Sequence, residues 1–256
     1  MKTAKRLVAM LLVAALLAVT PAAAMAAEYV PTKGTYYWYN GTKWEKGTEY
    51  SWSYKGDGKI KKVTYKEPSG HSSSNTYKWK GSFLKTVKYS AKEYTSYKFK
   101  NNRLQSMTDV YGGNKETGKF KWDKKKKKGT YKGDGFSNVI TVNSKGQRVK
   151  QSYIYTDNTY TYSYKYYSNG NLKSISMKGP GYSFSTKYNK AGYVTSRKSS
   201  DGYSFTCKYK KNKKGQITEK ITKYADGNEN KVVYTKWKKV SRTWNCDAFG
   251  TQVSLG

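Results

Sequence analysis

The sequence predicts an all-β protein, an extended antiparallel β-meander of about nine repeated β-hairpins in an open or spiralling sheet, preceded by a signal-peptide helix. A short phrase of an aromatic residue, a polar gap, a glycine and an aliphatic residue recurs along the chain. This phrase is typical of a strand that ends, reverses at positive φ and begins again. The composition agrees, because enrichment in Tyr, Thr, Val, Phe and Trp, with 27 Tyr alone, favours strands over helices.

The first 26 residues have the pattern of a secretory signal peptide. Cations at positions 2, 5 and 6 precede an apolar run from Leu7 to Val19, and small residues fill positions 22–27. A membrane anchor is the alternative, but about 13 apolar residues cover only about 20 Å as a helix, against a hydrocarbon core of about 30 Å. Cleavage is expected after Ala26. The mature protein is then expected to have no integral membrane segment and to be secreted or associated with a bacterial cell surface.

The mature chain is expected to divide into three parts. Residues 27–49 contain an aromatic stretch around Asn40-Gly41, which predicts an N-terminal capping hairpin. Residues 50–240 are predicted to form the hairpin array, and residues 241–256 a C-terminal tail. An outer-membrane barrel is the alternative architecture, but its lipid-facing positions need aliphatic residues that this chain lacks.

The recurring phrase is clearest from Tyr166 to Leu172 and from Tyr188 to Val194, with a looser copy from Tyr209 to Ile217. The residues that precede the turns recur about every 23 residues, a length that holds two strands and two turns, so residues 50–240 predict roughly 14 to 18 strands. Gly170 and Gly192 are expected at positive φ. The residues that precede the turns are Tyr54, Trp79, Phe99, Trp122, Val142, Tyr166, Tyr188, Tyr209 and Trp237.

The two clear copies also resemble a known family. Tyr166-Tyr-Ser-Asn-Gly170-Asn-Leu172 and Tyr188-Asn-Lys-Ala-Gly192-Tyr-Val194 resemble the YD repeats of RHS-type extracellular proteins, in which Tyr-Asp precedes two variable residues, Gly, a variable residue and an aliphatic. Here Tyr167 and Asn189 replace the Asp. The resemblance implies a secreted or surface protein whose repeats form spiralling sheets that act as carriers, binding surfaces or shells. One functional hypothesis is therefore an extracellular protein-interaction scaffold whose charge only keeps it soluble.

Charge gives a second hypothesis. The chain has 50 Lys and Arg against 16 Asp and Glu, a formal net charge of +34, and its only arginines are at positions 6, 103, 148, 197 and 242. Specific base or bidentate phosphate recognition generally uses Arg, so the excess of Lys indicates diffuse attraction to polyanions and no specific nucleic-acid partner. The alternative is that Lys solubilises exposed strands and blocks edge pairing.

The strand from Tyr160 to Tyr166 alternates Tyr with Thr, Ser and Lys, the period of two that separates the faces of a sheet. Lysines that each precede a Tyr are expected to form a row suited to a linear polyanion, while exposed Tyr faces contact sugar rings. Alternatively, the Tyr residues form cross-strand ladders. The leading hypothesis is a non-enzymatic exported protein that binds an anionic cell-wall polymer or glycan. The candidate binding residues are Lys165, Lys187 and Lys208 with Tyr166, Tyr188 and Tyr209.

Nothing in the sequence points to an enzyme, a cofactor or a metal site. The one His, His71, stands in a polar turn, and metal ligation or general-base chemistry needs partners that the sequence does not cluster around it. Many carboxylates occupy turns, as in Asp201-Gly202 and Asp226-Gly227, where Asp is favoured as a turn former.

Two cysteines remain. In an exported protein, Cys207 and Cys246 permit one intramolecular disulfide, which would attach the tail to the array. Two independent thiols are the alternative.

Overall fold

The structure is a computed structural model that describes residues 28–123, 125, 127–133 and 135–253; the predicted signal peptide lies outside these ranges. Within them the chain is built from strands and turns, and no helix is found that is long and apolar enough to cross a membrane. The prediction of an all-β antiparallel fold is confirmed.

The described residues form a 19-stranded antiparallel sheet. Of these strands, β3 to β19 begin after residue 50, in agreement with the expected number for the hairpin array. The strands are β1 (Glu28–Tyr39), β2 (Trp44–Tyr54), β3 (Ile60–Lys66), β4 (Ser72–Lys80), β5 (Phe83–Lys88), β6 (Tyr94–Lys100), β7 (Arg103–Tyr111), β8 (Asn114–Lys119), β9 (Lys121–Asp123), β10 (Lys128–Lys132), β11 (Phe136–Val142), β12 (Arg148–Tyr155), β13 (Thr159–Tyr166), β14 (Leu172–Gly179), β15 (Tyr182–Tyr188), β16 (Val194–Ser199), β17 (Phe205–Lys211), β18 (Ile217–Tyr224) and β19 (Glu229–Val240).

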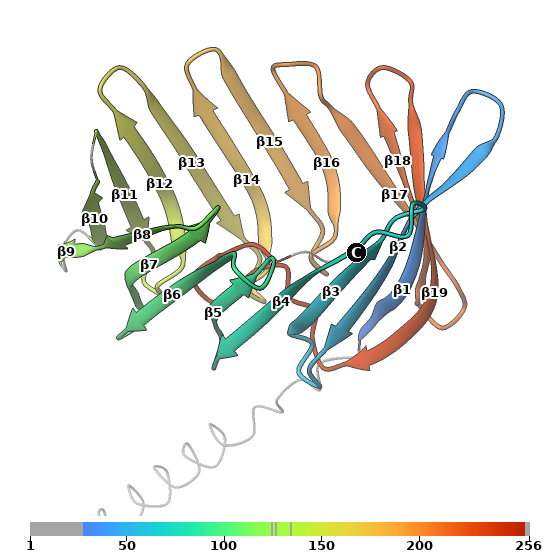
Figure 1. The fold of residues 1–256 in the computed structure, drawn as a ribbon, viewed down its shortest axis with the longest axis horizontal. Coiled ribbons are helices and arrows are strands. Elements are labelled where there is room, and N and C mark those ends of the chain that lie inside the picture. The colour runs from blue at the N-terminus through green and yellow to red at the C-terminus, as the bar shows by residue number, and fades with distance from the viewer. Residues whose placement is uncertain (1–27, 124, 126, 134, 254–256) are drawn as a thin grey trace, which may run out of the picture.

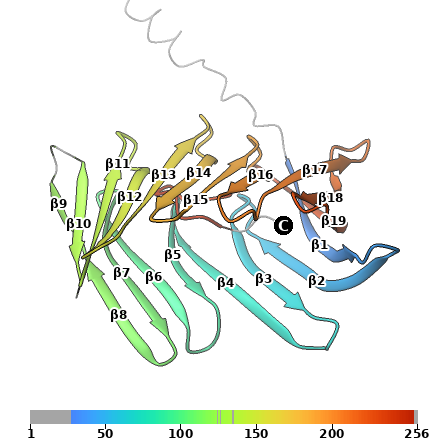
Figure 2. The ribbon, with the colours of Figure 1, turned by 90° about the horizontal axis from the view of Figure 1, so that it is seen from above.

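The sheet is nearly closed and barrel-like, so the expectation of an open or spiralling meander is wrong. Strands pair in chain order, and β1 pairs with both β2 and β19, which joins the first strand to the last. At the other side of the ring, β8 pairs with β7 and its continuation β9 pairs with β10. The cross-section is flattened, with β2 to β8 along one wall and β10 to β19 along the other (Figures 1 and 2).

Closure depends on residues 28–49, which were expected to form a separate cap. They do form a hairpin around Asn40-Gly41, with Tyr39 opposite Trp44. The first strand, however, also pairs along most of its length with β19, from Glu28 opposite Val240 to Trp38 opposite Asn230. This arrangement satisfies the backbone groups of two strands that would otherwise be exposed edges.

The recurring phrase forms one turn with a register shift. In its clearest copy Tyr167 N donates to Asn171 O (2.8 Å) and Gly170 N to Tyr167 O (2.9 Å), and a β-bulge lies between Lys165 and Tyr166. The bulge supplies the local bend that a closed sheet needs. Gly170 and Gly192 have φ values of 86° and 90°, as predicted.

The third copy of the phrase is placed differently from the prediction. Its turn bonds join Asn212 N to Gln216 O (3.0 Å) and Gly215 N to Asn212 O (2.9 Å), and its bulge falls between Lys210 and Lys211. Lys211, and not Tyr209, is therefore the counterpart of Tyr166 and Tyr188. The prediction placed this copy two residues too early, because Tyr209 is the nearest aromatic residue before the turn.

The bulged turns gather at one end of the barrel, where β19 also ends and which we call the tail end. The turns at the opposite, far end follow β1, β3, β5, β7, β10, β12, β14, β16 and β18. Side chains alternate between an aliphatic and aromatic interior and a Ser-, Thr- and Lys-rich exterior, as in β13, where Tyr164 is buried and Lys165 is exposed. Three clusters of buried residues, centred on Ile60, Ile140 and Leu172, form the core.

Candidate functional site

The six residues predicted to bind a polymer lie on two different faces. Lys165, Lys187 and Lys208 are exposed on the outside of the sheet. Tyr188 is buried, and Tyr166 pairs with the buried Leu172 on the interior side. The tyrosines therefore cannot share a binding face with the lysines.

Strand register places two of the three lysines in one row. Lys165 and Lys187 stand on either side of Ser174, and Ser196 follows Lys187 in the same row. On β17 the row reaches Thr206, so Lys208 lies two residues away from it. The two lysines are on alternate strands, about 10 Å apart at the usual strand spacing.

The three tyrosines hold the inside of the barrel together. The Tyr166 hydroxyl donates to Arg148 O (2.5 Å), the Tyr209 hydroxyl donates to Val194 O (2.7 Å), and the Tyr188 hydroxyl accepts from Gln252 Nε2 (2.8 Å). Burial raises the pKa of Tyr188 to about 12 and also raises the pKa of Tyr166 and Tyr209. These phenols are structural hydrogen-bonding groups on the inside of the barrel, so they do not face a polymer that binds the outer lysines.

Carboxylates are unevenly distributed over the outer surface. Strands β3 to β6 on one wall and β10 to β17 on the other contain no Asp or Glu, and each of them except β11 contains Lys. The strand carboxylates lie in the two zones where the walls meet, at β1–β2 with β18–β19 and at β7–β9. In the first zone several pair with lysines, as in Lys46–Glu49 (2.6 Å) and Lys210–Glu219 (2.7 Å). In the second, Asp109 accepts from Thr95 (2.6 Å) and Glu116 accepts from Tyr131 (3.3 Å). The barrel thus has two broad outer walls whose own strands supply no carboxylate to their lysines.

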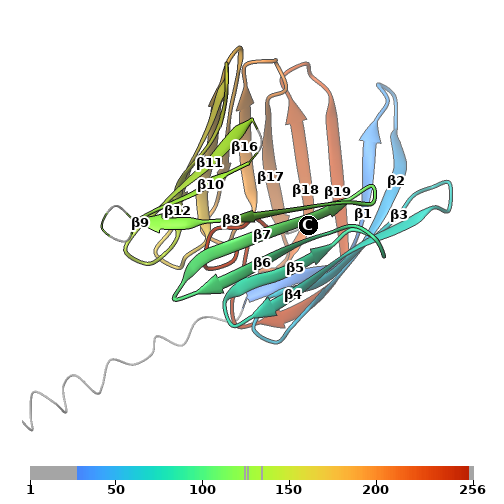
Figure 3. The same cartoon turned by 60° about the vertical axis from the view of Figure 1, so that its left-hand side comes forward.

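Residues 241–253 of the C-terminal tail occupy the interior of the barrel at the tail end (Figures 1 and 3). Cys246, Asp247 and Phe249 are each 1% exposed. The Trp244 ring lies 6.1 Å from the Trp79 ring and under the Arg242 guanidinium (3.7 Å), and its indole N–H donates to Asp57 O (3.0 Å). The expected tail is therefore part of the core.

Two polar tail side chains attach to opposite walls. Asn245 Oδ1 accepts from Leu172 N (2.9 Å) and its Nδ2 donates to Leu172 O (3.2 Å), which attaches the tail to β14. Asp247 Oδ2 accepts from Leu84 N (2.9 Å) at the start of β5 on the other wall. Both amides follow a bulged turn, so the tail supplies acceptors that a regular ladder would otherwise provide.

Asp247 also organises the tail itself. Its Oδ1 accepts from Phe249 N (3.0 Å) and Thr251 N (2.7 Å). Complete burial raises the pKa of Asp247 to about 6, although these backbone donors and the positive charge of Arg148 oppose the increase. The carboxylate is therefore a structural group whose charge is only partly compensated by its neighbours.

Each cysteine is buried and free, so the predicted disulfide is not formed. Cys207 belongs to β17, with its Sγ 3.6 Å from Thr222 Oγ1, whereas Cys246 Sγ lies 3.4 Å from Gly170 O, beneath the turn that joins β13 to β14. Burial raises the pKa of Cys246 to about 12 and also raises that of Cys207. The tail is held by hydrogen bonds and packing and not by a covalent link.

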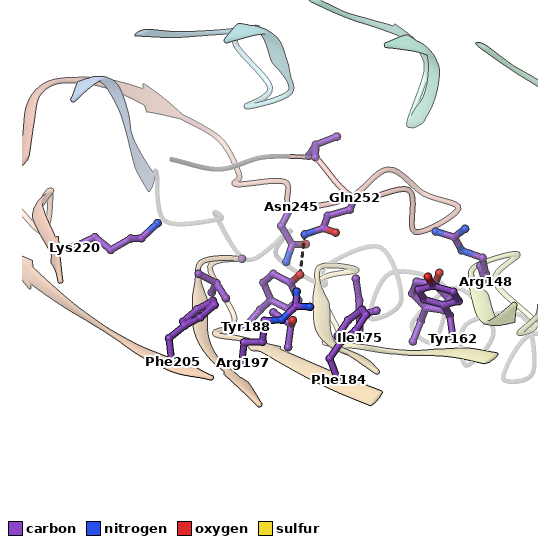
Figure 4. A pocket seen from close by; sticks show the side chains of 15 residues that line it. Arg148, Tyr162, Ile175, Phe184, Tyr188, Arg197, Phe205, Lys220, Asn245 and Gln252 are labelled. Atoms are coloured by element: carbon purple, nitrogen blue, oxygen red, sulfur yellow. Dashed lines mark hydrogen bonds between the residues drawn. The ribbon is translucent and has the colours of Figure 1, made fainter. Parts of the chain in front are cut away.

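The space inside the barrel that the tail leaves free forms connected cavities. A cavity of about 430 Å³, the inner cavity, is lined by strand residues that include Tyr188 and Phe184 and by Asn245 and Gln252 of the tail (Figure 4). A second cavity of about 300 Å³ shares Val194, Phe205 and Lys220 with it.

The inner cavity is positively charged. Arg148, Arg197 and Lys220 line it, and no Asp or Glu does. Arg148 donates from Nη2 to Gly250 O (3.0 Å) and lies 4.3 Å from the centre of the Tyr164 ring. It therefore already has a hydrogen-bond acceptor in the tail. Lys220 faces the cavity without a carboxylate partner among the described residues. Arg197 lines the same cavity, and its charge adds to the hydrogen bonds from Ser199 and the Tyr203 amide that lower the pKa of Asp201.

His71 is exposed in the turn after β3, where it was expected. Among the described residues, no three His, Cys, Asp or Glu side chains lie close enough together to hold a metal ion.

The interior position of the tail was not predicted, although the tail sequence contains the spacing of the repeated phrase. Cys246-Asp-Ala-Phe-Gly250-Thr-Gln252 has the spacing of the repeated phrase, with Gly four residues after the first position. It forms the same turn, with Asp247 N donating to Thr251 O (2.9 Å) and Gly250 N to Asp247 O (3.0 Å), and Cys246 forms an isolated β-bridge with Gln252. The tail is thus a further, very short copy of the hairpin folded inside the others.

No family model matches the chain, and no curated protein matches it. Among solved structures, it is similar to a porin-like protein from Bacteroides uniformis ATCC 8492, with 12% identity, a TM-score of 0.43 and coverage of 80% of this chain and 97% of that one. A porin-like protein from Bacteroides vulgatus ATCC 8482 matches with 11% identity, a TM-score of 0.37 and coverage of 81% and 98%. The TcdB2-TccC3 structure without its hypervariable C-terminal region matches with 9% identity, a TM-score of 0.31 and coverage of 82% and 16%. These scores carry no argument about function, so the resemblance to YD repeats stays a prediction.

Proposed function

We propose that this protein is an exported, non-enzymatic β-repeat protein that binds anionic polymers or glycans of the bacterial cell envelope through the outside of its barrel. The proposal rests on the two lysine-rich walls, β3–β6 and β10–β17, whose strands lack Asp and Glu. A long polyanion can contact many ammonium groups on such a wall without a shaped pocket.

The observation that carries the proposal most directly is the row of Lys165, Ser174, Lys187 and Ser196. Its small hydroxyl side chains leave the ammonium groups accessible and add hydrogen-bonding groups between them. Repulsion among lysines that lack acidic neighbours is unfavourable to the free protein, and a bound polyanion relieves it. Lys198, in the adjacent row opposite Ser185, extends the charged surface.

The test is a pull-down of the mature protein on isolated bacterial cell walls across a salt series. Binding through exposed charges should fall steeply by 0.5 M salt, where the Debye length is about 4 Å. Retention that does not respond to salt would contradict the proposal and favour the alternative, an extracellular protein-interaction scaffold.

A matched pair of variants makes this test specific for the walls. Replacing Lys165, Lys187 and Lys198 together by Gln should weaken binding and reduce its salt dependence, because three phosphate or carboxylate contacts are lost. The control replaces Lys43, Lys46 and Lys223 together by Gln. These substitutions remove the same formal charge, but the three lysines are paired with carboxylates and lie outside the wall strands. Equal losses of binding in the two variants would show that net charge, and not the lysine-rich walls, determines retention.

A further inference from the structure

We propose that the cavities inside the barrel bind a second kind of ligand, a small anion that carries a flat aromatic ring, with Lys220 and Arg197 as its positively charged partners. This site is separate from the outer walls, because it lies on the opposite face of the same strands.

Lys220 is the first cation that an anionic ligand could neutralise. It stands on β18 opposite Tyr209 on one side and Val232 on the other, and it lines both the inner and the second cavity. Burial lowers its pKa, and within the described part of the chain neither cavity contains a carboxylate. A partly buried ammonium group among aromatic rings without a counter-ion is unfavourable for the free protein. An anionic ligand would supply the missing charge.

Arg197 is the second cation available to such a ligand. Its Nη2 donates to the Tyr182 hydroxyl (3.0 Å), and the guanidinium lies 4.2 Å from the centre of the Phe184 ring. Its Nε is buried and has no hydrogen-bond partner among the described residues. The group is thus held by one neutral hydrogen bond and the Phe184 ring, with the Tyr203 ring farther away at 5.9 Å. A buried donor and a charge that forms no direct ion pair remain available for a ligand.

The cavity walls define the rest of the ligand. Phe184, Phe205, Tyr162 and Tyr188 line the inner cavity from the strands, and Figure 4 shows Phe184, Phe205 and Arg197 projecting from the same side. Flat aromatic surfaces and a guanidinium plane favour a stacked ring over a flexible chain. The volumes of about 430 and 300 Å³ fit a small molecule and not a polymer.

The far end of the barrel gives access to these cavities. A third cavity of about 730 Å³ opens there and shares Tyr36, Tyr203, Tyr224 and Asn230 with the second. Trp38 and Tyr203 at its rim are 41% and 53% exposed. Three carboxylates also line this opening, but each has a partner: Asp201 accepts from the Tyr203 amide (3.0 Å), Asp226 accepts from Asn228, and Glu229 pairs with Lys223. An aromatic ligand therefore meets ring surfaces from the rim to Lys220.

The experiment is calorimetric titration of the mature protein with 2-naphthoate and with its neutral analogue 2-naphthylmethanol. We expect 2-naphthoate to bind at least about tenfold more tightly, because a hydrogen bond to a charged group gives at least that discrimination. Lys220→Gln should weaken 2-naphthoate binding by at least the same factor, and Lys220→Arg should restore it. Lys223→Gln, on the outer face of the same strand, is the matched control and should bind as the parent does.

Three results would overturn the proposal: no binding of 2-naphthoate, equal binding of the neutral analogue, or parental affinity in Lys220→Gln. Thermal melting of each variant identifies any that fail to fold, and Lys220→Arg then decides the outcome. Binding should also persist at 0.5 M salt, since buried pairs are screened less than exposed ones. The variant that lacks Lys165, Lys187 and Lys198 should retain 2-naphthoate affinity, so this test is independent of the test on cell walls.

Discussion

The two ends of the barrel are built from similar turns but differ in what surrounds them. At the tail end, a methyl group on Gly58 would lie 1.7 Å from Arg242 O, because the tail passes directly beneath that turn. At the far end, Gly70 has a similar φ of 88° but nothing within 4 Å of the same position. The far end also carries exposed aromatic side chains such as Tyr111. Turn chemistry alone therefore does not show which end is packed and which is accessible.

Removal of the tail should have the largest effect. A chain that ends at Val240 lacks Trp244 and Phe249 and leaves the amides of Leu84 and Leu172 without their acceptors. Loss of one large aromatic from a core costs about 3–5 kcal/mol, so we expect the free energy of unfolding to fall by more than about 5 kcal/mol in total. Urea unfolding followed by tryptophan fluorescence measures this. A parental midpoint would show that the tail is only an accessory.

Gly58 and Gly70 allow the tail end and the far end to be compared on the same strand, since Gly58 precedes β3 and Gly70 follows it. Gly70→Ala should cost about 1–2 kcal/mol, the usual penalty for a left-handed residue with a Cβ. Gly58→Ala should cost at least about 3 kcal/mol, because the clash with Arg242 O is added to the same backbone penalty. Chemical denaturation of both variants gives the two values, and equal losses would mean that the tail does not pack under the turn.

Asp247 gives the tail end a pH dependence. Its pKa of about 6 in the folded protein lies above the unfolded value of about 3.9. The resulting stabilisation is complete below about pH 4 and is lost as pH rises through 6, a change of about 3 kcal/mol for a two-unit shift. Asp247→Asn should remove this change, so its stability relative to the parent should rise by about that amount between pH 4 and pH 7.5. Parallel pH curves for the two proteins would contradict the raised pKa.

The smallest effect is expected at the far end. Tyr111 is 74% exposed, so Tyr111→Ser should change the free energy of unfolding by no more than about 0.5 kcal/mol. Differential scanning calorimetry against the parent measures it. A loss as large as that of a core residue would show that the far-end rim is a packed structure.

Much of the wall was predictable from local patterns. Alternation along Tyr160–Tyr166 predicted that Lys165 lies on the face opposite the Tyr residues, and the Gly170 and Gly192 turns follow from backbone geometry that few other residues adopt. Lys187 shares the face of Lys165 by the same alternation. Each of these predictions depends on interactions within one hairpin.

The missed features depend on contacts between distant parts of the chain. Closure requires β1 to meet β19, and no local pattern in Glu28–Tyr39 specifies that partner. The inward orientation of the Tyr face and the burial of Asp247 follow from closure, because only a closed sheet has an interior for the tail to fill. The shifted third repeat has a different cause, since Lys211 occupies a position held by Tyr in the other two copies.

Hydrogen exchange at the amides of Leu84 and Leu172 tests the central claim, that the tail is the core which joins the two walls. Leu84 N donates to Asp247 and Leu172 N donates to Asn245, on opposite walls. We expect both amides to exchange as slowly as those in the middle of β5 and β14, since opening them requires the tail to leave. Exchange at the rate of the far-end turn amides would contradict a tail packed inside the barrel.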